Sequence, residues 1–195
     1  VIILLPLHIL FVKYLHKDQK TLEKNKGSIF FWWPLFIIIL AFITIADSFT
    51  EGGIDSWAAL YMRDAIGVEG FKIGIPAICF NLFMVFGRLI GDKIRDKLGV
   101  YKFLLSLILM TLLGLVIIIS YNTILSSIIG FSILGFGISS IIPLAYSLAS
   151  KIEGIDSAVG ISIISICAYG VFMIAPAGMG LIAKFIGISY VFSPM

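Results

Sequence analysis

The feature that most limits how this chain can fold is a stretch of 48 residues, Phe103–Ser150, that contains no Asp, Glu, Lys or Arg. As a helix it would be roughly 70 Å long at about 1.5 Å per residue, whereas the hydrocarbon core of a bilayer is about 30 Å thick. The stretch therefore has room for two membrane crossings, with Tyr121-Asn122-Thr123 as the turn between them. The whole chain is 60% hydrophobic and 13% charged, against roughly 45–50% and 25% in soluble domains, so its apolar surface requires lipid.

Similar apolar stretches elsewhere predict an all-α membrane protein with five complete spans and two partial ones. We expect the complete spans at 29–62, 71–91, 103–120, 123–149 and 157–183. Residues 1–12 and 188–195 are apolar pieces too short to span, and 13–28 forms a lysine-rich loop. Because the short apolar pieces indicate helices cut at both ends, we expect the chain to be a fragment of a longer protein.

Lysine and arginine are concentrated in every second connection between the spans. The segments 13–28, 91–102 and 151–156, with the adjoining Arg88, hold 11 of the 14 cations, and the remaining three are Arg63, Lys72 and Lys184. Cytoplasmic loops of membrane proteins carry an excess of Lys and Arg. We therefore expect a multi-pass protein of the cell membrane with the three cation-rich segments on its cytoplasmic side.

The charged connection after the second complete span contains a recurring pattern of glycines and charges. The residues of this pattern are Gly87, Arg88, Gly91, Asp92, Asp96, Lys97 and Gly99. Glycines let helix ends approach closely, carboxylates stabilise helix N-termini, and cations pair with carboxylates or lipid phosphates. Taken alone, the pattern indicates either a conformational motif or an ordinary cation-rich loop.

The run Asp96-Lys97-Leu98-Gly99 resembles the Asp-Arg/Lys-x-Gly core of the signature of the major facilitator superfamily. That signature lies between the second and third helices of the family, with a weaker copy between the eighth and ninth. Here Asp92 stands at the leading glycine position, and Val100-Tyr101 replaces two cations. The segment 55–64 also resembles the end of the seventh helix in a prokaryotic branch of the superfamily similar to fucose permeases.

This resemblance implies the C-terminal half of a transporter, built from two inverted three-helix repeats. The complete spans would be helices seven to eleven, preceded by the end of helix six at 1–12 and the central cytoplasmic loop at 13–28, and followed by the start of helix twelve at 188–195. The implied function is alternating-access transport of a small solute by a secondary transporter that a proton or ion gradient drives.

The resemblance also implies partners and excludes some chemistry. The missing partner would be the N-terminal six-helix half or a second copy, and no cofactor, metal or nucleic acid is expected. The sequence has no Gly-x-x-x-x-Gly-Lys-Ser/Thr phosphate loop. It also lacks mid-span groups that converge as an intramembrane enzyme would need, so we expect no enzymatic activity. A non-transporting structural or sensor protein, or a transporter remnant, is the alternative.

Five polar side chains within the spans are candidates for the solute or ion pathway: Asp47, Glu51, Asn81, Tyr146 and Tyr169. A carboxylate at the centre of a membrane helix costs about 2.5–3.5 kcal/mol on insertion scales. Asp47 and Glu51, one turn apart, are therefore expected to face the interior and carry a proton or cation, unless the bilayer boundary comes early and both meet outside water. The other three contact either the solute or a neighbouring helix.

Glycine and proline interrupt two of the spans at related places. Gly52 and Gly53 directly follow Glu51, and Pro143 lies in the corresponding helix of the second repeat. Interrupted helices commonly surround the binding sites of transporters and move as gates. We therefore expect hinges at Gly52, Gly53 and Pro143.

Overall fold

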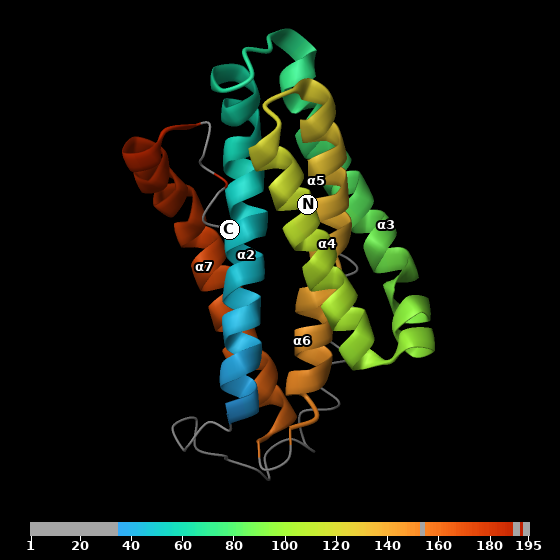
Figure 1. Cartoon of the computed structure of the whole chain (residues 1–195). Helices are drawn as coiled ribbons and strands as arrows, with labels where there is room; N and C mark the ends of the chain where they lie inside the picture. The colour runs from blue at the N-terminus through green and yellow to red at the C-terminus, as the bar shows by residue number, and fades with distance from the viewer. Residues whose placement is uncertain (1–34, 153–154, 189–191, 193–195) are drawn as a thin grey trace, which may run out of the picture.

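A computed structural model describes residues 35–152, 155–188 and 192 of the chain. In this part the chain forms a bundle of long helices, without a strand among the described residues (Figure 1). The helices are α2 (Leu35–Asp64), the 3-10 helix η3 (Gly70–Gly74), α3 (Ile75–Leu98), α4 (Val100–Ser120), α5 (Ile124–Ile138), α6 (Ile141–Ala149) and α7 (Ser157–Ile186). The expected elements at 1–28 and most of 188–195 lie outside the described residues.

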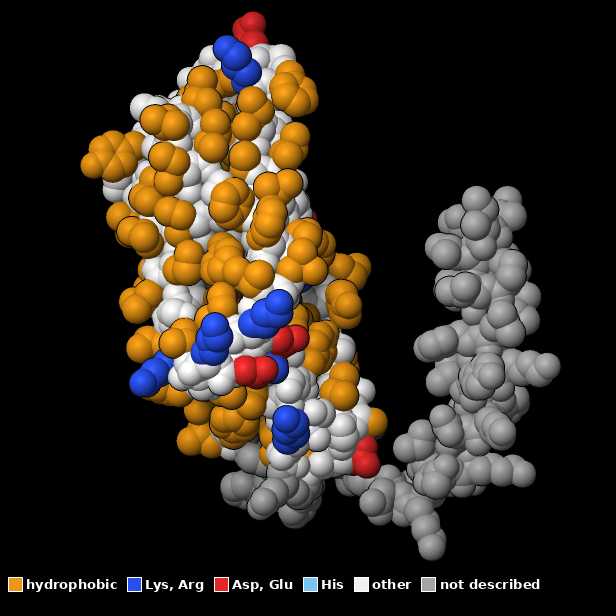
Figure 2. Space-filling view, turned by 90° about the vertical axis from the view of Figure 1, so that its right-hand side faces the viewer, with side chains coloured by type: hydrophobic (Ala, Val, Ile, Leu, Met, Phe, Trp, Pro, Cys, Tyr) orange, Lys and Arg blue, Asp and Glu red, His pale blue; other side chains and the backbone are white. Residues whose placement is uncertain are grey.

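The length and composition of these helices confirm the expected all-α membrane fold. Five helical stretches are long and apolar enough to cross a membrane, when η3 with α3 and α5 with α6 are each taken as one stretch. The face shown in Figure 2 is mostly hydrophobic along the length of the bundle, and its charged side chains lie toward the two ends. This distribution matches a bilayer around the middle of the bundle and water at its ends.

Small residues allow the helices of the bundle to approach closely. On α4 and α5, Gly114 and Gly130 face each other, so that a Cβ atom at Gly114 would lie 2.8 Å from the Gly130 carbonyl oxygen. On α5, Gly135 lies directly against the backbone carbonyl of Phe80 on α3. Because lipid offers little hydrophobic drive for helix association, close packing of this kind is a main source of stability in membranes.

The charged segment 91–102 is helical except at one residue, and our expectation of a loop there was wrong. Helix α3 continues to Leu98, and Gly99 alone separates it from α4. Arg95 forms an ion pair with Asp92 one turn earlier, at 2.8 Å, which stabilises the helical conformation locally. The reversal of direction needs a residue at positive φ, and Gly99 has φ 79° and ψ 156°.

The expected helix 123–149 is divided into α5 and α6, with Ser139 and Ser140 between them. Pro143 lies in the first turn of α6, where a missing backbone N–H disturbs no hydrogen bond within that helix. By contrast, α2 continues without interruption through Gly52 and Gly53. A Cβ atom at Gly52 would lie 3.2 Å from the Phe172 carbonyl oxygen, so this glycine admits α7 close to α2.

Candidate functional site

A cavity of about 340 Å³ opens between α2, α3, α6 and α7. Its lining combines charged, hydroxyl and aromatic side chains from these four helices: Ser48, Glu51, Arg88, Ile142, Tyr146, Ala168, Tyr169 and Phe172. Three of the five predicted pathway residues, Glu51, Tyr146 and Tyr169, therefore lie around one space, although they are far apart in the sequence. A largely apolar cavity with a few convergent polar and charged groups is the expected form of a solute site in a membrane protein.

Arg88 is the residue that connects the walls of this cavity. A terminal nitrogen of its guanidinium group lies 3.7 Å from Oε1 of Glu51 on α2. Its Nε donates a hydrogen bond of 3.1 Å to the carbonyl oxygen of Ser139 at the end of α5. The Arg88 side chain is 48% exposed and that of Glu51 is 20% exposed. The ion pair is thus accessible from the cavity rather than enclosed in the core.

The carbonyl oxygen of Ser139 is free to accept from Arg88 because of Pro143. In a continuous α-helix this oxygen would accept from the backbone N–H four residues later, and that residue is Pro143, which has none. Membrane proteins tolerate such a break when a neighbouring helix supplies the missing hydrogen bond. Arg88 from α3 supplies it here, so the helix break and the cavity are parts of one arrangement.

The two glycines beside Arg88 allow α3 to reach the break between α5 and α6. A Cβ atom at Gly87 would overlap the Ser139 side chain, and one at Gly91 would overlap the Ser140 hydroxyl. Ser140 Oγ in turn lies 3.5 Å from the Gly87 carbonyl oxygen. Gly87 and Gly91 therefore set the depth at which α3 packs, and this depth brings the intervening Arg88 to Ser139.

The remaining residues of the predicted motif lie at the end of α3, away from the cavity. Arg95 contacts both Asp92, at 2.8 Å, and Asp96, at 3.2 Å. Lys97 is exposed in the last turn, where a cation interacts favourably with the helix dipole. The structure thus divides the motif into an interior part, Gly87-Arg88 with Gly91, and a charged helix end.

Asp47 faces a second cavity, of about 230 Å³, on another side of α2. Apart from Asp47, Thr50 and Thr111, this cavity is lined by apolar side chains of α2, α4, α5 and α6. Asp47 is 5% exposed, and its Oδ1 has no hydrogen-bond partner among the described residues. Residues four apart on a helix differ by about 40° in direction, which is enough here to separate Asp47 from the cavity of Glu51.

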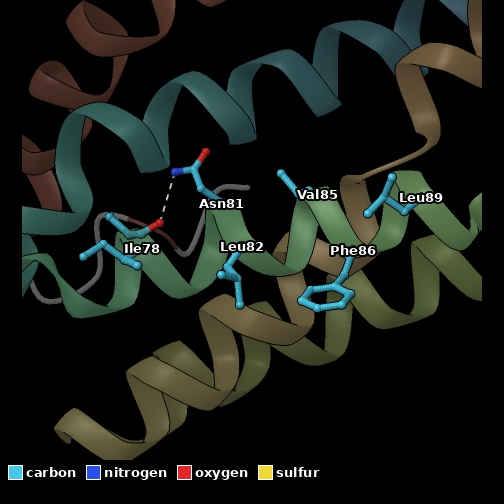
Figure 3. A pocket seen from close by; sticks show the side chains of 7 residues that line it. Ile78, Asn81, Leu82, Val85, Phe86 and Leu89 are labelled. Atoms are coloured by element: carbon cyan, nitrogen blue, oxygen red, sulfur yellow. Dashed lines mark hydrogen bonds between the residues drawn. The ribbon is translucent and has the colours of Figure 1, made fainter.

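Asn81 lies apart from both cavities, in a shallow apolar groove along α3 (Figure 3). Its Nδ2 donates to the carbonyl oxygen of Ala77 at 3.0 Å and lies 3.4 Å from Oδ1 of Asp55 on α2. Ile78, Leu82 and Phe86 are among the apolar residues beside it. The structure therefore does not bring Asn81 together with Glu51 and Arg88.

Sequence reasoning missed Ser48 and Ser139 as parts of the site. Ser48 lies on the cavity wall, and its Oγ has no hydrogen-bond partner among the described residues. Ser139 contributes a backbone carbonyl, which no side-chain pattern predicts. The available signal was the position of Pro143, because the residue four places before a proline has an unpaired carbonyl in any continuing helix.

The bundle and its interior cavities define an integral all-α membrane protein. Comparison with known proteins gives the family: the model of the Major Facilitator Superfamily matches residues 9–193, and the chain belongs to that superfamily. No solved structure shows significant similarity to it.

Three curated relatives are similar over most of the chain. An uncharacterised MFS-type transporter of Yersinia pestis is 30% identical over 173 residues, which cover 87% of this chain and 44% of that protein. The membrane protein MosC of Rhizobium meliloti is 27% identical over 77% of the chain and 36% of its own length. An uncharacterised transporter of Sinorhizobium fredii is 26% identical over 76% of the chain and 39% of its own length. The chain thus spans less than half the length of these relatives.

Proposed function

We propose that this chain forms the C-terminal half of a secondary transporter that moves a small solute across the plasma membrane by alternating access. The observation that supports this best is the cavity in which Glu51, Arg88 and Tyr146 converge beside a broken helix. A structural or sensor protein has no need to keep a charged pair open to a cavity within the bilayer, where burying charge is costly. In this proposal an N-terminal half encloses the cavity from the other side.

The moving element in this proposal is the break between α5 and α6. Ser139 and Ser140 separate two helices that contact different neighbours, so a small rotation at the break would change the shape of the cavity. The hinge proposed at Pro143 therefore acts through the Ser139 carbonyl, which accepts from Arg88 instead of from a backbone N–H. Gly52 lies where α2 packs against α7, and in this proposal it and the adjacent Gly53 permit sliding of the two helices rather than bending of α2.

The energy source in this proposal is a gradient of protons or cations, and its carriers are Asp47 and Glu51. Both carboxylates lie within the bundle and border a cavity. A carboxylate in such a place can lose or gain its charge, and the change alters its attraction to Arg88 and to the solute. The chain is also proposed to belong to the branch similar to fucose permeases.

The test is solute accumulation in proteoliposomes that contain the full-length protein carrying this chain. We expect accumulation with an imposed proton or sodium gradient, and loss of this gradient dependence in Asp47→Asn and Glu51→Gln. Glu69→Gln, which changes an exposed residue outside α2, is the matched control and should behave as the unmodified protein. If both carboxylate variants accumulate solute normally at every pH, ion coupling through this chain is wrong.

A further inference from the structure

We propose that the transported solute carries one carboxylate group, which Arg88 binds in the cavity between α2, α3, α6 and α7. This inference rests on the proposed transport function and adds the chemical class of the solute. It depends on three features of the cavity: a fixed guanidinium group, a weakly held carboxylate beside it, and apolar and aromatic walls of limited size.

The guanidinium group of Arg88 is held in one orientation with part of it unused. Its hydrogen bond to Ser139 engages Nε at 3.1 Å, and the glycine contacts of Gly87 fix the helix from which it projects. One N–H of each terminal nitrogen projects from the end of the planar group, so these two donors form a fork that the bond to Ser139 leaves open. A planar fork of this kind matches both oxygens of a carboxylate and binds them with two parallel hydrogen bonds.

Glu51 occupies the place of such a carboxylate only loosely. The 3.7 Å separation between Glu51 Oε1 and the Arg88 nitrogen exceeds the roughly 2.7–2.9 Å of a charge-assisted hydrogen bond. Within the described residues, no hydrogen bond holds the Glu51 carboxylate in position. A solute carboxylate that approaches Arg88 directly would therefore make better contacts than Glu51 does, and would replace it.

With Glu51 protonated, the charge that remains among the residues lining the cavity is that of Arg88, which favours an anion over a cation as the solute. Arg88 is the cation among the residues that line this cavity, and arginine keeps its charge at all physiological pH values. The charged and titratable groups near Glu51 are Asp47 and Asp55, one turn before and after it on α2, and Arg88, Tyr146 and Tyr169 around the same cavity. When Glu51 takes up a proton, Arg88 loses its partner, and a bound anion restores neutrality in the bilayer.

The size and walls of the cavity limit the rest of the solute. A volume of about 340 Å³ lies at the lower end of the roughly 300–1,000 Å³ of small-molecule sites. Ile142, Tyr169 and Phe172 line it with apolar and aromatic surface. One cation accommodates one carboxylate, so the class is a small monocarboxylate with an apolar or aromatic body, and the proton on Glu51 accompanies it.

The experiment uses the purified full-length protein in detergent, with benzoate and acetate as probes and benzamide, acetamide and glucose as uncharged controls. Binding is measured as the rise in the midpoint of thermal unfolding at several probe concentrations. We expect the carboxylates to stabilise the protein and their amides to have no effect. Arg88→Gln should weaken benzoate binding at least about tenfold, Arg88→Lys should weaken it less, and Arg63→Gln at the exposed end of α2 should leave it unchanged.

Glu51→Gln provides an independent test that leaves Arg88 in place. Because this change removes the competing carboxylate, we expect benzoate to bind more tightly at neutral pH and to lose the strengthening that acidification causes in the unmodified protein. This measurement stays informative even if Arg88→Gln does not fold.

The possible failures of the two proposals are distinguishable. If benzamide or glucose stabilises as well as benzoate, or if benzoate binds equally to Arg88→Gln, the monocarboxylate class is wrong, while transport of another solute still stands. If carboxylates bind through Arg88 but proteoliposomes accumulate none of them under any ion gradient, the binding class stands and the proposed transport function fails.

Discussion

Arg88 on α3 donates from Nε to the carbonyl oxygen of Ser139, and so closes the gap that the break between α5 and α6 leaves in the backbone hydrogen bonding. The same side chain lies 3.7 Å from Glu51 on α2. One arginine therefore connects a helix break with a carboxylate of the candidate site. When Arg88 changes its partner in the cavity, its hydrogen bond to Ser139 at the break changes too. The proposed alternating-access mechanism requires such a coupling between the site and a movable element.

Pro143→Ala should reduce transport while leaving the protein at least as stable. Alanine supplies a backbone N–H that can donate to the Ser139 carbonyl oxygen, so α5 and α6 can join into one helix. Arg88 then has to share this carbonyl with the backbone. We expect slower solute uptake in proteoliposomes and an unchanged or higher midpoint of thermal unfolding. The control is Pro76→Ala in the first turn of α3, which makes the same chemical change away from the break between α5 and α6. Normal uptake by Pro143→Ala would contradict a role for the break.

Gly87→Ala should destabilise the protein through a collision with Ser139, and a second change should restore stability. The added methyl group overlaps the Ser139 side chain, and overpacking of this kind typically costs about 1–3 kcal/mol. Ser139→Gly in the same protein removes the colliding atoms but keeps the carbonyl that binds Arg88. We expect a lower midpoint of thermal unfolding for Gly87→Ala and recovery in the double variant.

The matched control for this pair is Gly170→Ala on α7, where a Cβ atom meets nothing within 4 Å. It should leave the unfolding midpoint unchanged or raise it slightly, since alanine favours the helix by about 1 kcal/mol over glycine. If Ser139→Gly fails to rescue Gly87→Ala, the two residues do not pack as described.

Trp57→Phe should weaken the contact between α2 and α7 modestly. The Trp57 indole donates from Nε1 to the Pro176 carbonyl oxygen at 3.1 Å, and such a hydrogen bond contributes about 1 kcal/mol net. Phenylalanine keeps most of the aromatic packing against Gly180, whereas Trp57→Ala loses both terms. We expect the free energy of unfolding, followed by circular dichroism, to decrease slightly for Phe and several-fold more for Ala. An unchanged free energy of unfolding for Phe would mean that the hydrogen bond contributes nothing, and equal losses for Phe and Ala would mean that the aromatic packing contributes nothing.

Asp47→Asn should raise the stability of the protein and abolish the coupling of transport to an ion gradient. Asp47 is nearly fully buried, and its Oδ1 has no partner among the described residues. A buried carboxylate that must carry charge in part of a cycle costs stability, and an amide removes that cost. We expect a higher unfolding midpoint together with loss of gradient-driven accumulation. A lower midpoint with normal accumulation would assign Asp47 a purely structural role.

Single cysteines at the two ends of the bundle should label from opposite sides of the membrane. Lys97 lies in the last turn of α3, Glu69 precedes η3, and both are exposed. With Cys79 and Cys167 replaced by serine, we expect Glu69→Cys to react with an impermeant maleimide added outside intact cells. Lys97→Cys should react only after the membrane is opened. The reverse pattern would contradict the orientation predicted from Lys and Arg.

The prediction of an all-α membrane protein held because it depends on the hydropathy and length of single segments, which do not depend on tertiary contacts. A run without charge such as Phe103–Ser150 can be stable only in lipid, whatever it contacts, so the membrane helices were predictable from composition. Helix ends were less so. The extension of α3 to Leu98 depends on the local pairing of Arg95 with Asp92 and on the positive φ of Gly99. Hydropathy alone records neither.

The candidate site was predictable in part. Glu51, Tyr146 and Tyr169 were singled out because polar groups in membrane helices are costly unless they face the interior, and they do line one cavity. Asn81 met the same criterion and lies elsewhere, because its amide is used by Ala77 and lies beside Asp55. The free-energy cost of a polar group in the membrane identifies the residues that need a hydrogen-bonding or charged partner, but it does not identify the partner.

The sequence by itself determined that this protein is an all-α membrane protein with apolar helices long enough to cross a bilayer, because both properties follow from the solvation of single residues and short segments. Only the tertiary structure decided that Arg88 meets both Glu51 and Ser139. That meeting depends on the depth and register at which α3 packs against the break between α5 and α6. The contacts of Gly87 and Gly91 with Ser139 and Ser140 set this depth and register. The residues in these contacts lie about fifty positions apart in the sequence, so local sequence patterns do not show them.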